Sequence, residues 1–70
     1  MLSRWETYSD IVTVLAFEAD VSAVHYRHED GREGYTGTGL FPHDLEVGQQ
    51  YKGQFSRDDD TPYCSFEKQR

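Results

Sequence analysis

The sequence is poor in cysteine and positive charge and has no long apolar run, and each shortage excludes a class of protein. Its one cysteine, Cys64, cannot form an intrachain disulfide, so we expect a protein of a reducing compartment. The apolar run at residues 11–17 contains Thr13 and follows Glu6 and Asp10, which is not typical of a signal peptide. It is also far shorter than the roughly 20 residues of a membrane span. We therefore predict a cytoplasmic protein with no membrane contact.

Positive charge is scarce, because 7 Lys and Arg residues stand against 13 Asp and Glu residues, for a net charge of −6. Binding to duplex nucleic acid needs a basic face that displaces counterions, so this charge argues against it. The same charge suits solubility or attraction to a basic partner.

The chain is short, and its 70 residues predict one domain spanning residues 1–70. A domain of this size buries only about 60% of the surface of its unfolded chain. Its core is therefore small, and a homodimer or another partner could complete it. Aromatic residues make up 14% of the sequence, and such large rings compensate for few aliphatic side chains.

Alternating apolar residues predict five short strands, at residues 11–17, 21–28, 34–38, 50–57 and 63–68. The first is apolar on both faces and β-branched, so we expect it to be well buried. The pair Asp30-Gly31 predicts a type I′ hairpin between the second and third strands. Ser3 and Glu6 have the spacing of a capping box, which predicts a short helical turn before the first strand.

The stretch LFPHDLEVGQQYKGQF, residues 40–55, predicts a corner between the third and fourth strands. Pro42 cannot donate to a sheet, so residues 42–45 are expected to form a tight or 3₁₀ turn. Gly53 is expected to let the fourth strand coil between two rings on one face, Tyr51 and Phe55. Cys64 is expected to be a small core residue beside Phe66. Five strands with a corner indicate an all-β fold, a small five-stranded barrel.

The same stretch carries a leucine, then a glycine–glutamine pair, then an alternating strand: Leu45, Gly48, Gln49, Tyr51 and Phe55. This pattern resembles the fourth strand of small OB-fold barrels, cold-shock domains in particular. Phe41 and His43 are similar to the Phe-x-His element of the nucleic-acid face of those domains. The glycine–phenylalanine element of their second strand is absent, and AVHYRHEDG stands there. The resemblance, confined to residues 41–55, implies an OB-like barrel. An SH3-like barrel, in which the corner usually precedes the last strand, is the alternative.

Catalytic, metal and cofactor motifs are weak, so we predict that the protein is not an enzyme and binds no cofactor. His25 and His28 are three residues apart and point to opposite faces of a strand, so they do not hold one metal together. Cys64 lies in no recognisable nucleophile motif. The aspartates at 58–60 lack the closing glutamate of a calcium loop. The sequence GYTGTG is followed by Pro42 where a phosphate-binding helix would begin.

The leading interpretation is a small, acidic, non-catalytic protein-binding module, an inhibitor or adaptor that docks on a basic protein surface of the kind that binds nucleic acid. The candidate residues are Asp58, Asp59, Asp60, Glu29, Asp30, Asp44 and Glu46.

The alternative is weak binding of single-stranded nucleic acid through an aromatic face. Its candidate residues are Tyr26, Tyr35, Phe41, His43 and Arg27. Tyr35 and Tyr63 are the rings expected to be exposed, while Phe41, Phe55 and Phe66 are expected in the core. A third possibility is a homodimer paired through an edge strand.

Overall fold

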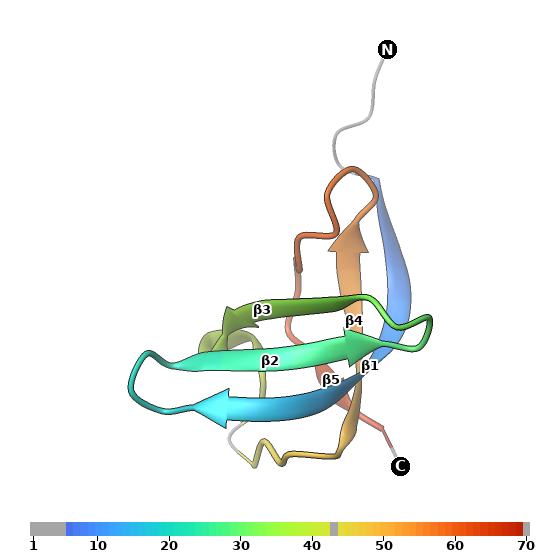
Figure 1. Ribbon diagram of the computed structural model, residues 1–70. Coiled ribbons are helices and arrows are strands. Elements are labelled where there is room, and N and C mark those ends of the chain that lie inside the picture. The colour runs from blue at the N-terminus through green and yellow to red at the C-terminus, as the bar shows by residue number, and fades with distance from the viewer. Residues whose placement is uncertain (1–5, 43, 70) are drawn as a thin grey trace.

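The computed structural model describes residues 6–42 and 44–69, which form one five-stranded antiparallel sheet. Its strands are β1 (Thr7–Glu18), β2 (Ala23–His28), β3 (Glu33–Gly37), β4 (Gln50–Ser56) and β5 (Glu67–Lys68), and a 3₁₀ turn, η1 (Thr38–Leu40), follows β3 (Figure 1). The strand order is β3-β2-β1-β4-β5. The predicted all-β class with five strands is therefore confirmed. None of the described residues belongs to a helix that is long and apolar enough to cross a membrane.

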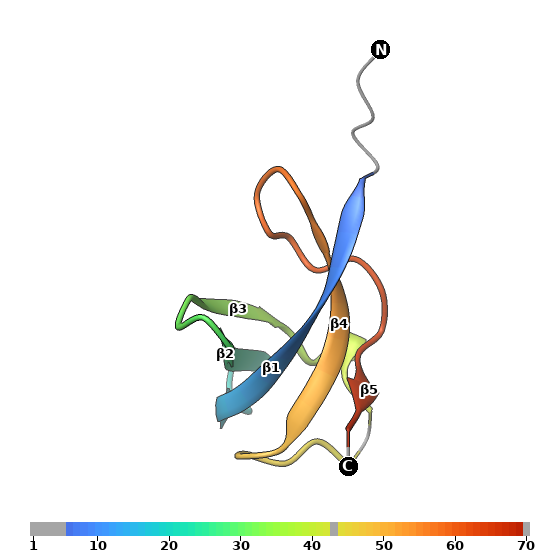
Figure 2. The ribbon, with the colours of Figure 1, turned by 90° about the vertical axis from the view of Figure 1, so that its right-hand side faces the viewer.

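β1 is the central strand, and its two halves pair with different neighbours. Its residues 7–13 pair with β4, and its residues 12–18 pair with β2. Between Val14 and Ala16 the register shifts, which leaves Leu15 as the extra residue of a β-bulge. Bulges bend a strand and increase its twist, and β1 curves from the direction of β4 into that of β2 (Figures 1 and 2). The strand begins at Thr7 rather than at the predicted Ile11, because the polar residues before Ile11 also pair with β4.

The core lies on one face of the curved sheet and is mainly aromatic. Its buried apolar side chains are Val12, Val14, Val24, Tyr26, Phe41, Tyr51, Phe55 and Phe66. The ring of Phe66 stacks on that of Phe41 at a centroid distance of 4.3 Å, and Tyr51 meets Phe41 edge-on at 5.2 Å. The expected core positions of Phe41, Phe55 and Phe66 are confirmed. The expectation that both faces of the first strand are buried is wrong, because Ile11 and Thr13 on its outer face are only partly covered.

Gly53, in the middle of β4, provides the space that the ring of Phe66 occupies. A Cβ atom at residue 53 would lie 2.7 Å from Cδ2 and 2.9 Å from Cζ of Phe66, and closer still to Cε2. Carbon atoms of separate residues do not approach this closely, since their favourable separation is about 3.5–4.0 Å. A glycine is therefore required at this position for the observed packing.

The hairpin between β2 and β3 lies where Asp30-Gly31 predicts it, but its turn is of another type. Gly31 has a φ of +100°, whereas Asp30 is not left-handed. The Gly31 amide donates to the carbonyl of His28, and the His28 amide donates to the carbonyl of Arg32. A type I′ turn needs two left-handed residues. The loop instead has the features of the three-residue type, a type I turn followed by a left-handed glycine.

The turn predicted at residues 42–45 is present, because the Leu45 amide donates to the carbonyl of Pro42. The 3₁₀ turn η1, at Thr38–Leu40, is an additional turn before it. The predicted extent of the last strand is wrong, because the strand covers only Glu67–Lys68 instead of 63–68. Before it, the chain pairs with β4 at one isolated bridge, where Pro62 lies opposite Phe55.

The short last strand also changes the environment of Cys64. The Phe66 amide donates to the carbonyl of Leu40 at 2.6 Å rather than to β4, so the segment before β5 leaves the sheet. Cys64 is consequently exposed, and its predicted place in the core is wrong. β2 begins at Ala23 rather than residue 21, because residues 19–22 form a turn closed by the Ser22 amide and the Ala19 carbonyl. The helical turn predicted from Ser3 lies outside the described residues.

Candidate functional site

Two acidic loops that are distant in sequence meet at one end of the sheet. The Arg32 side chain, from the β2–β3 loop, places Nε 2.9 Å from Oδ2 of Asp30 and Nη1 2.6 Å from Oδ2 of Asp60. Asp60 belongs to the turn after β4, 28 positions further along the chain. We call this region the acidic end, defined by Glu29, Asp30, Asp58, Asp59 and Asp60. It contains five of the seven acidic residues predicted to bind a partner.

The polar contacts of Arg32 and Asp60 continue into the sheet. They form a network with Tyr8, Asp10 and His28. The Tyr8 hydroxyl donates to Oδ1 of Asp60, and Nη2 of Arg32 donates to the Tyr8 oxygen at 3.3 Å. Nδ1 of His28 lies 2.7 Å from Oδ2 of Asp10. His28 is 3% exposed and packs against the Phe55 ring at 4.6 Å. These three residues were not predicted, because their proximity depends on strand pairing that no local motif encodes.

The network keeps two of its carboxylates, Asp60 and Asp30, in the ionised form. The hydrogen bond from Tyr8, followed by contact with Arg32, lowers the pKa of Asp60. The backbone N–H of Arg32, followed by its guanidinium, lowers the pKa of Asp30. Burial raises the pKa of the Tyr8 hydroxyl, and Asp60 adds to that effect. The carboxylates are therefore held in the ionised form, with their loops in defined positions.

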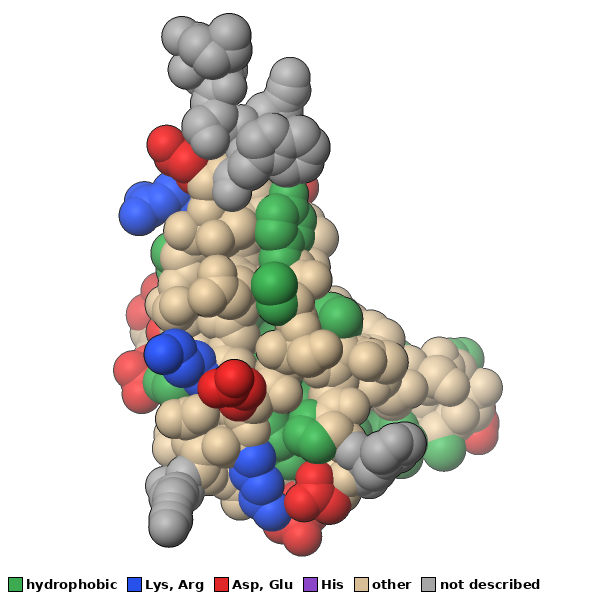
Figure 3. Space-filling view, turned by 180° about the vertical axis from the view of Figure 1, so that it is seen from behind, with side chains coloured by type: hydrophobic (Ala, Val, Ile, Leu, Met, Phe, Trp, Pro, Cys, Tyr) green, Lys and Arg blue, Asp and Glu red, His purple; other side chains and the backbone are tan. Residues whose placement is uncertain are grey.

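The remaining predicted acids, Asp44 and Glu46, are not part of the acidic end. They precede β4, whereas residues 58–60 follow it, so the two groups lie at opposite ends of that strand. Asp44 is also paired with Nζ of Lys68 at 3.4 Å. Seen from behind, the molecule carries acidic and basic side chains near one another, with hydrophobic ones between them (Figure 3).

The residues predicted to stack on nucleic-acid bases are divided between core and surface. Tyr26 is 2% exposed and Phe41 is 8% exposed, so both rings are committed to the core and cannot cover a base. Tyr35 is 61% exposed and Arg27 is exposed, while His43 lies outside the described residues. Tyr63 is exposed as expected.

An aromatic pair on the outer face of β2 and β3, with His25 partly buried and Tyr35 exposed, was not predicted. His25 and Tyr35 are cross-strand partners, and their rings stack at a centroid distance of 4.3 Å with an interplanar angle of 7°. Nε2 of His25 lies 2.9 Å from Oε1 of Glu33. Cross-strand pairs of this kind are found from sequence only when the strand register is known.

A polar hollow of about 380 Å³ opens beside the acidic end. It lies between β3 and the segment that follows β4, and its lining comes from β2, β3 and residues 59–62. The lining residues are Tyr26, His28, Arg32, Glu33, Gly34, Tyr35, Asp59, Asp60, Thr61 and Pro62. We refer to it below as the polar hollow.

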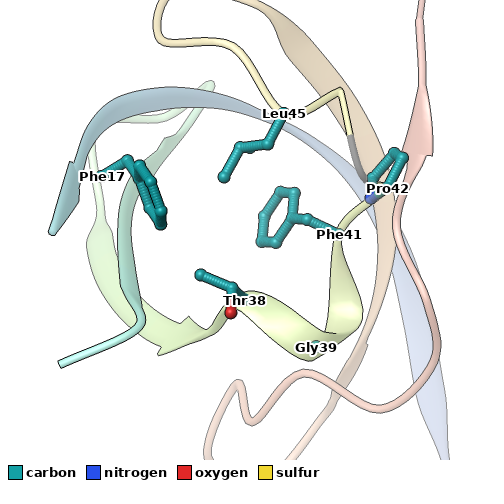
Figure 4. Close-up of a pocket in the computed structure, with 6 residues that line it drawn as sticks. All are labelled: Phe17, Thr38, Gly39, Phe41, Pro42 and Leu45. Carbon is teal, nitrogen blue, oxygen red and sulfur yellow. The ribbon is translucent and has the colours of Figure 1, made fainter. Parts of the chain in front are cut away.

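A second hollow, of about 420 Å³, is apolar and lies at the other end of β3 (Figure 4). It is lined by Phe17, Thr38, Gly39, Phe41, Pro42 and Leu45. Phe17 pairs with Val24 beyond the bulge in β1, so its ring lies on the core side of the sheet, yet it remains 47% exposed. The hollow is therefore an incompletely covered margin of the core.

The described residues do not include a group of three or more side chains suited to holding a metal ion. Comparison with known proteins gives no match to a family model, to a curated protein or to a solved structure. The geometry and charge of the chain itself are thus the basis for inferring its function.

Proposed function

We propose that this chain is a non-catalytic protein-binding module that docks through its acidic end on a basic partner surface. The observation that carries the proposal is the meeting of two acidic loops, which together carry five carboxylates, through the ion pairs of Asp30 and Asp60 with Arg32. A surface of this sign attracts a basic surface and speeds its encounter. Inhibitors and adaptors of nucleic-acid-binding proteins need this kind of surface, and we assign the chain to that class.

The acidic end divides into supporting and contacting carboxylates. Asp30 and Asp60 are bonded to Arg32, and Asp59 accepts hydrogen bonds from the amide and hydroxyl of Thr61. These bonds hold the loops in place before a partner arrives, which reduces the entropy lost on binding. Glu29 and Asp58 are exposed beside them, and we assign them the direct contact with the partner.

We also infer that the fold is an OB-like barrel. Three features support this inference: the strand count, the position of η1 between β3 and β4, and the hydrogen bond from Phe66 to Leu40. That bond brings the segment before β5 against the segment after β3, so the two edges of the sheet approach each other. An SH3-like barrel would usually have its corner before the last strand.

The test is partner capture from a cell lysate, with the purified chain immobilised and nuclease added. The double variant Glu29→Lys/Asp58→Lys should lose a partner that the wild type retains. Glu18→Lys/Asp20→Lys is the matched control, because it makes the same change in charge at exposed positions near the opposite end of β2. Equal capture by both double variants would contradict docking through the acidic end. Loss of the partner on nuclease treatment would contradict direct protein binding.

The second candidate function, weak binding of single-stranded nucleic acid, is favoured by the exposed ring of Tyr35, which stacks on His25, and by Arg27 on the same face. Aromatic rings that accept stacked bases bind without strong sequence preference. Fluorescence anisotropy with a labelled oligothymidine at low salt tests it. Tyr35→Ala should remove the binding, and binding that survives this change would exclude the stacking mode. A homodimer paired through an edge strand is tested separately. Light scattering measures the molar mass of the chain in solution, and a dimer would agree with pairing through β3, an edge strand.

A further inference from the structure

We propose that the polar hollow binds the side-chain cation of a lysine or arginine from the partner protein. This inference rests on the proposed function and names the group that the partner inserts. The hollow exists because β3 is an edge strand and is not paired with the segment after β4. Glu33, Gly34 and Tyr35 line one side of this gap, residues 59–62 line the other, and Tyr26 and His28 from β2 lie between them.

Two nearly buried polar groups line the hollow. Tyr26 is 2% exposed and His28 is 3% exposed, yet neither the Tyr26 hydroxyl nor Nε2 of His28 is hydrogen-bonded to another described residue. No fully buried polar side-chain atom of the described residues lacks a partner, so these two atoms open into the hollow. Both atoms are accessible from the hollow, so a ligand that enters it can form hydrogen bonds with them in place of water.

The Tyr26 hydroxyl and Nε2 of His28 can both accept hydrogen bonds. The carboxylate of Asp10 accepts from Nδ1 of His28 at 2.7 Å, so in the neutral imidazole the proton is on Nδ1 and Nε2 is an acceptor. The Tyr26 hydroxyl accepts equally well. Oδ1 of Asp59 accepts from the amide and hydroxyl of Thr61, and its Oδ2 is a further acceptor.

The charge of the hollow selects a cation. Two carboxylates, from Asp59 and Asp60, and one guanidinium, from Arg32, belong to its lining, while the Glu33 carboxylate is bonded to His25 on the outer face, so the net charge is −1 with His28 counted as neutral. The charge of Arg32 is already balanced by Asp30 and Asp60. An anion would be repelled, and an apolar group would leave the acceptors unpaired. An ammonium or guanidinium group supplies N–H donors and the opposite charge together.

The experiment is a titration followed by ¹H–¹⁵N NMR, with ionic strength held constant. The probes are n-butylammonium and methylguanidinium, which mimic the two side chains, and n-butanol is the neutral control. We expect saturable shifts at the amides of Gly34, Tyr35 and Thr61 with a cation and none with n-butanol. The absence of saturable shifts, or equal shifts with n-butanol, would overturn the proposal.

Two variants show whether the polar groups of the hollow carry the binding. Tyr26→Phe keeps the core ring and removes only the hydroxyl, and Asp59→Asn removes one charge at the mouth. Each should weaken binding of the cation about threefold to tenfold, as expected when one hydrogen bond is lost. Asp20→Asn, in the exposed β1–β2 turn, is the matched control and should bind as the wild type does. Unchanged affinity in both Tyr26→Phe and Asp59→Asn would refute the assignment.

A further probe distinguishes a protein side chain from a free amine. N-acetyl-lysine amide should bind at least as tightly as n-butylammonium, and failure of the capped lysine to bind would overturn the assignment to a protein partner. Failure of the docking proposal has a different signature, since Glu29 and Asp58 do not line the hollow. Cation binding combined with unaltered partner capture by Glu29→Lys/Asp58→Lys would reject docking through the acidic end and leave the hollow intact.

Discussion

Replacement of Gly53 by alanine should strongly destabilise the protein, although it adds a single methyl group. The new Cβ would lie 2.7 Å from Cδ2 and 2.9 Å from Cζ of Phe66. The Phe66 ring cannot easily move away, because it stacks on Phe41 at 4.3 Å and meets Phe55 edge-on at 5.6 Å. Relief therefore requires a shift of the whole segment that ends in β5.

The magnitude follows from two opposing effects. Overpacking a well-packed core destabilises by about 1–3 kcal/mol, and the loss of glycine flexibility in the unfolded chain gives back about 0.4–1 kcal/mol. Because the contacts with Phe66 are shorter than 3.0 Å, we expect an overpacking cost in the upper part of its range, about 2–3 kcal/mol, and a net loss of about 1–2.6 kcal/mol. For a domain of this size that lowers the melting temperature by roughly 4–20 °C. The total stability of such a small core is only about 3–5 kcal/mol, so the variant keeps a narrow margin.

Urea and thermal unfolding followed by circular dichroism measure this loss. Gly39→Ala is the control, because no atom lies within 4 Å of a Cβ at that position, and its stability should stay within about 0.5 kcal/mol of the wild type. Phe66→Leu should partly rescue Gly53→Ala, so that the double variant is more stable than the sum of the single losses predicts. A Gly53→Ala variant as stable as the wild type would refute the packing described for Phe66.

Three further predictions follow from the charge network, the hairpin and the margin of the core. Because the folded-state pKa of Asp60 lies below its ordinary value of 3.8, its stabilising contribution is present above that pH and is lost as the pH falls through the lower folded value. Thermal unfolding of Asp60→Asn from about pH 5 downward should therefore show a smaller loss than the wild type, and parallel curves would contradict this. Gly31→Ala, at a φ of +100°, should lower stability by about 1 kcal/mol in urea titration, and no loss would mean that the loop has another conformation. Phe17→Ala should cost clearly less than Phe55→Ala in the same titration, because Phe17 is 47% exposed and Phe55 is fully buried; equal losses would show that the apolar hollow is closed in solution. Phe55→Ala should lose about 3–5 kcal/mol, which is measured in a stabilising osmolyte if the variant is mostly unfolded in buffer.

The strands were largely predictable because alternation of apolar residues is a local signal. Tyr51 and Phe55 illustrate this, since their spacing alone places both rings on the buried face of β4. Strand ends were less predictable. Thr7 and its polar neighbours form a strand only because β4 lies beside them, and residues 63–65 fail to form one because the Phe66 amide bonds to Leu40 instead.

The candidate site was predictable in composition but not in arrangement. The acidic residues of both loops were identified from sequence, while Arg32, which joins them, was not among the predicted site residues. Its role depends on the approach of two loops, and no local pattern encodes that approach. Tyr26 and His28 alternate with exposed residues on β2, which indicates burial, but their polar ends meet the hollow only because β3 lacks a partner on its far side.

The position of β1 at the centre of the sheet also bears on how the chain is synthesised. β1, β2 and β3 are consecutive hairpin neighbours, so they can pair as soon as they leave the ribosome. The pairing of β1 with β4 joins residues as distant as Thr7 and Ser56, which are 56 − 7 = 49 positions apart, and such non-local pairing slows folding. Until β4 emerges, the first half of β1 has an open edge, which is a site for association with other chains. The risk of misassembly is therefore concentrated in the interval before the last quarter of the chain is made.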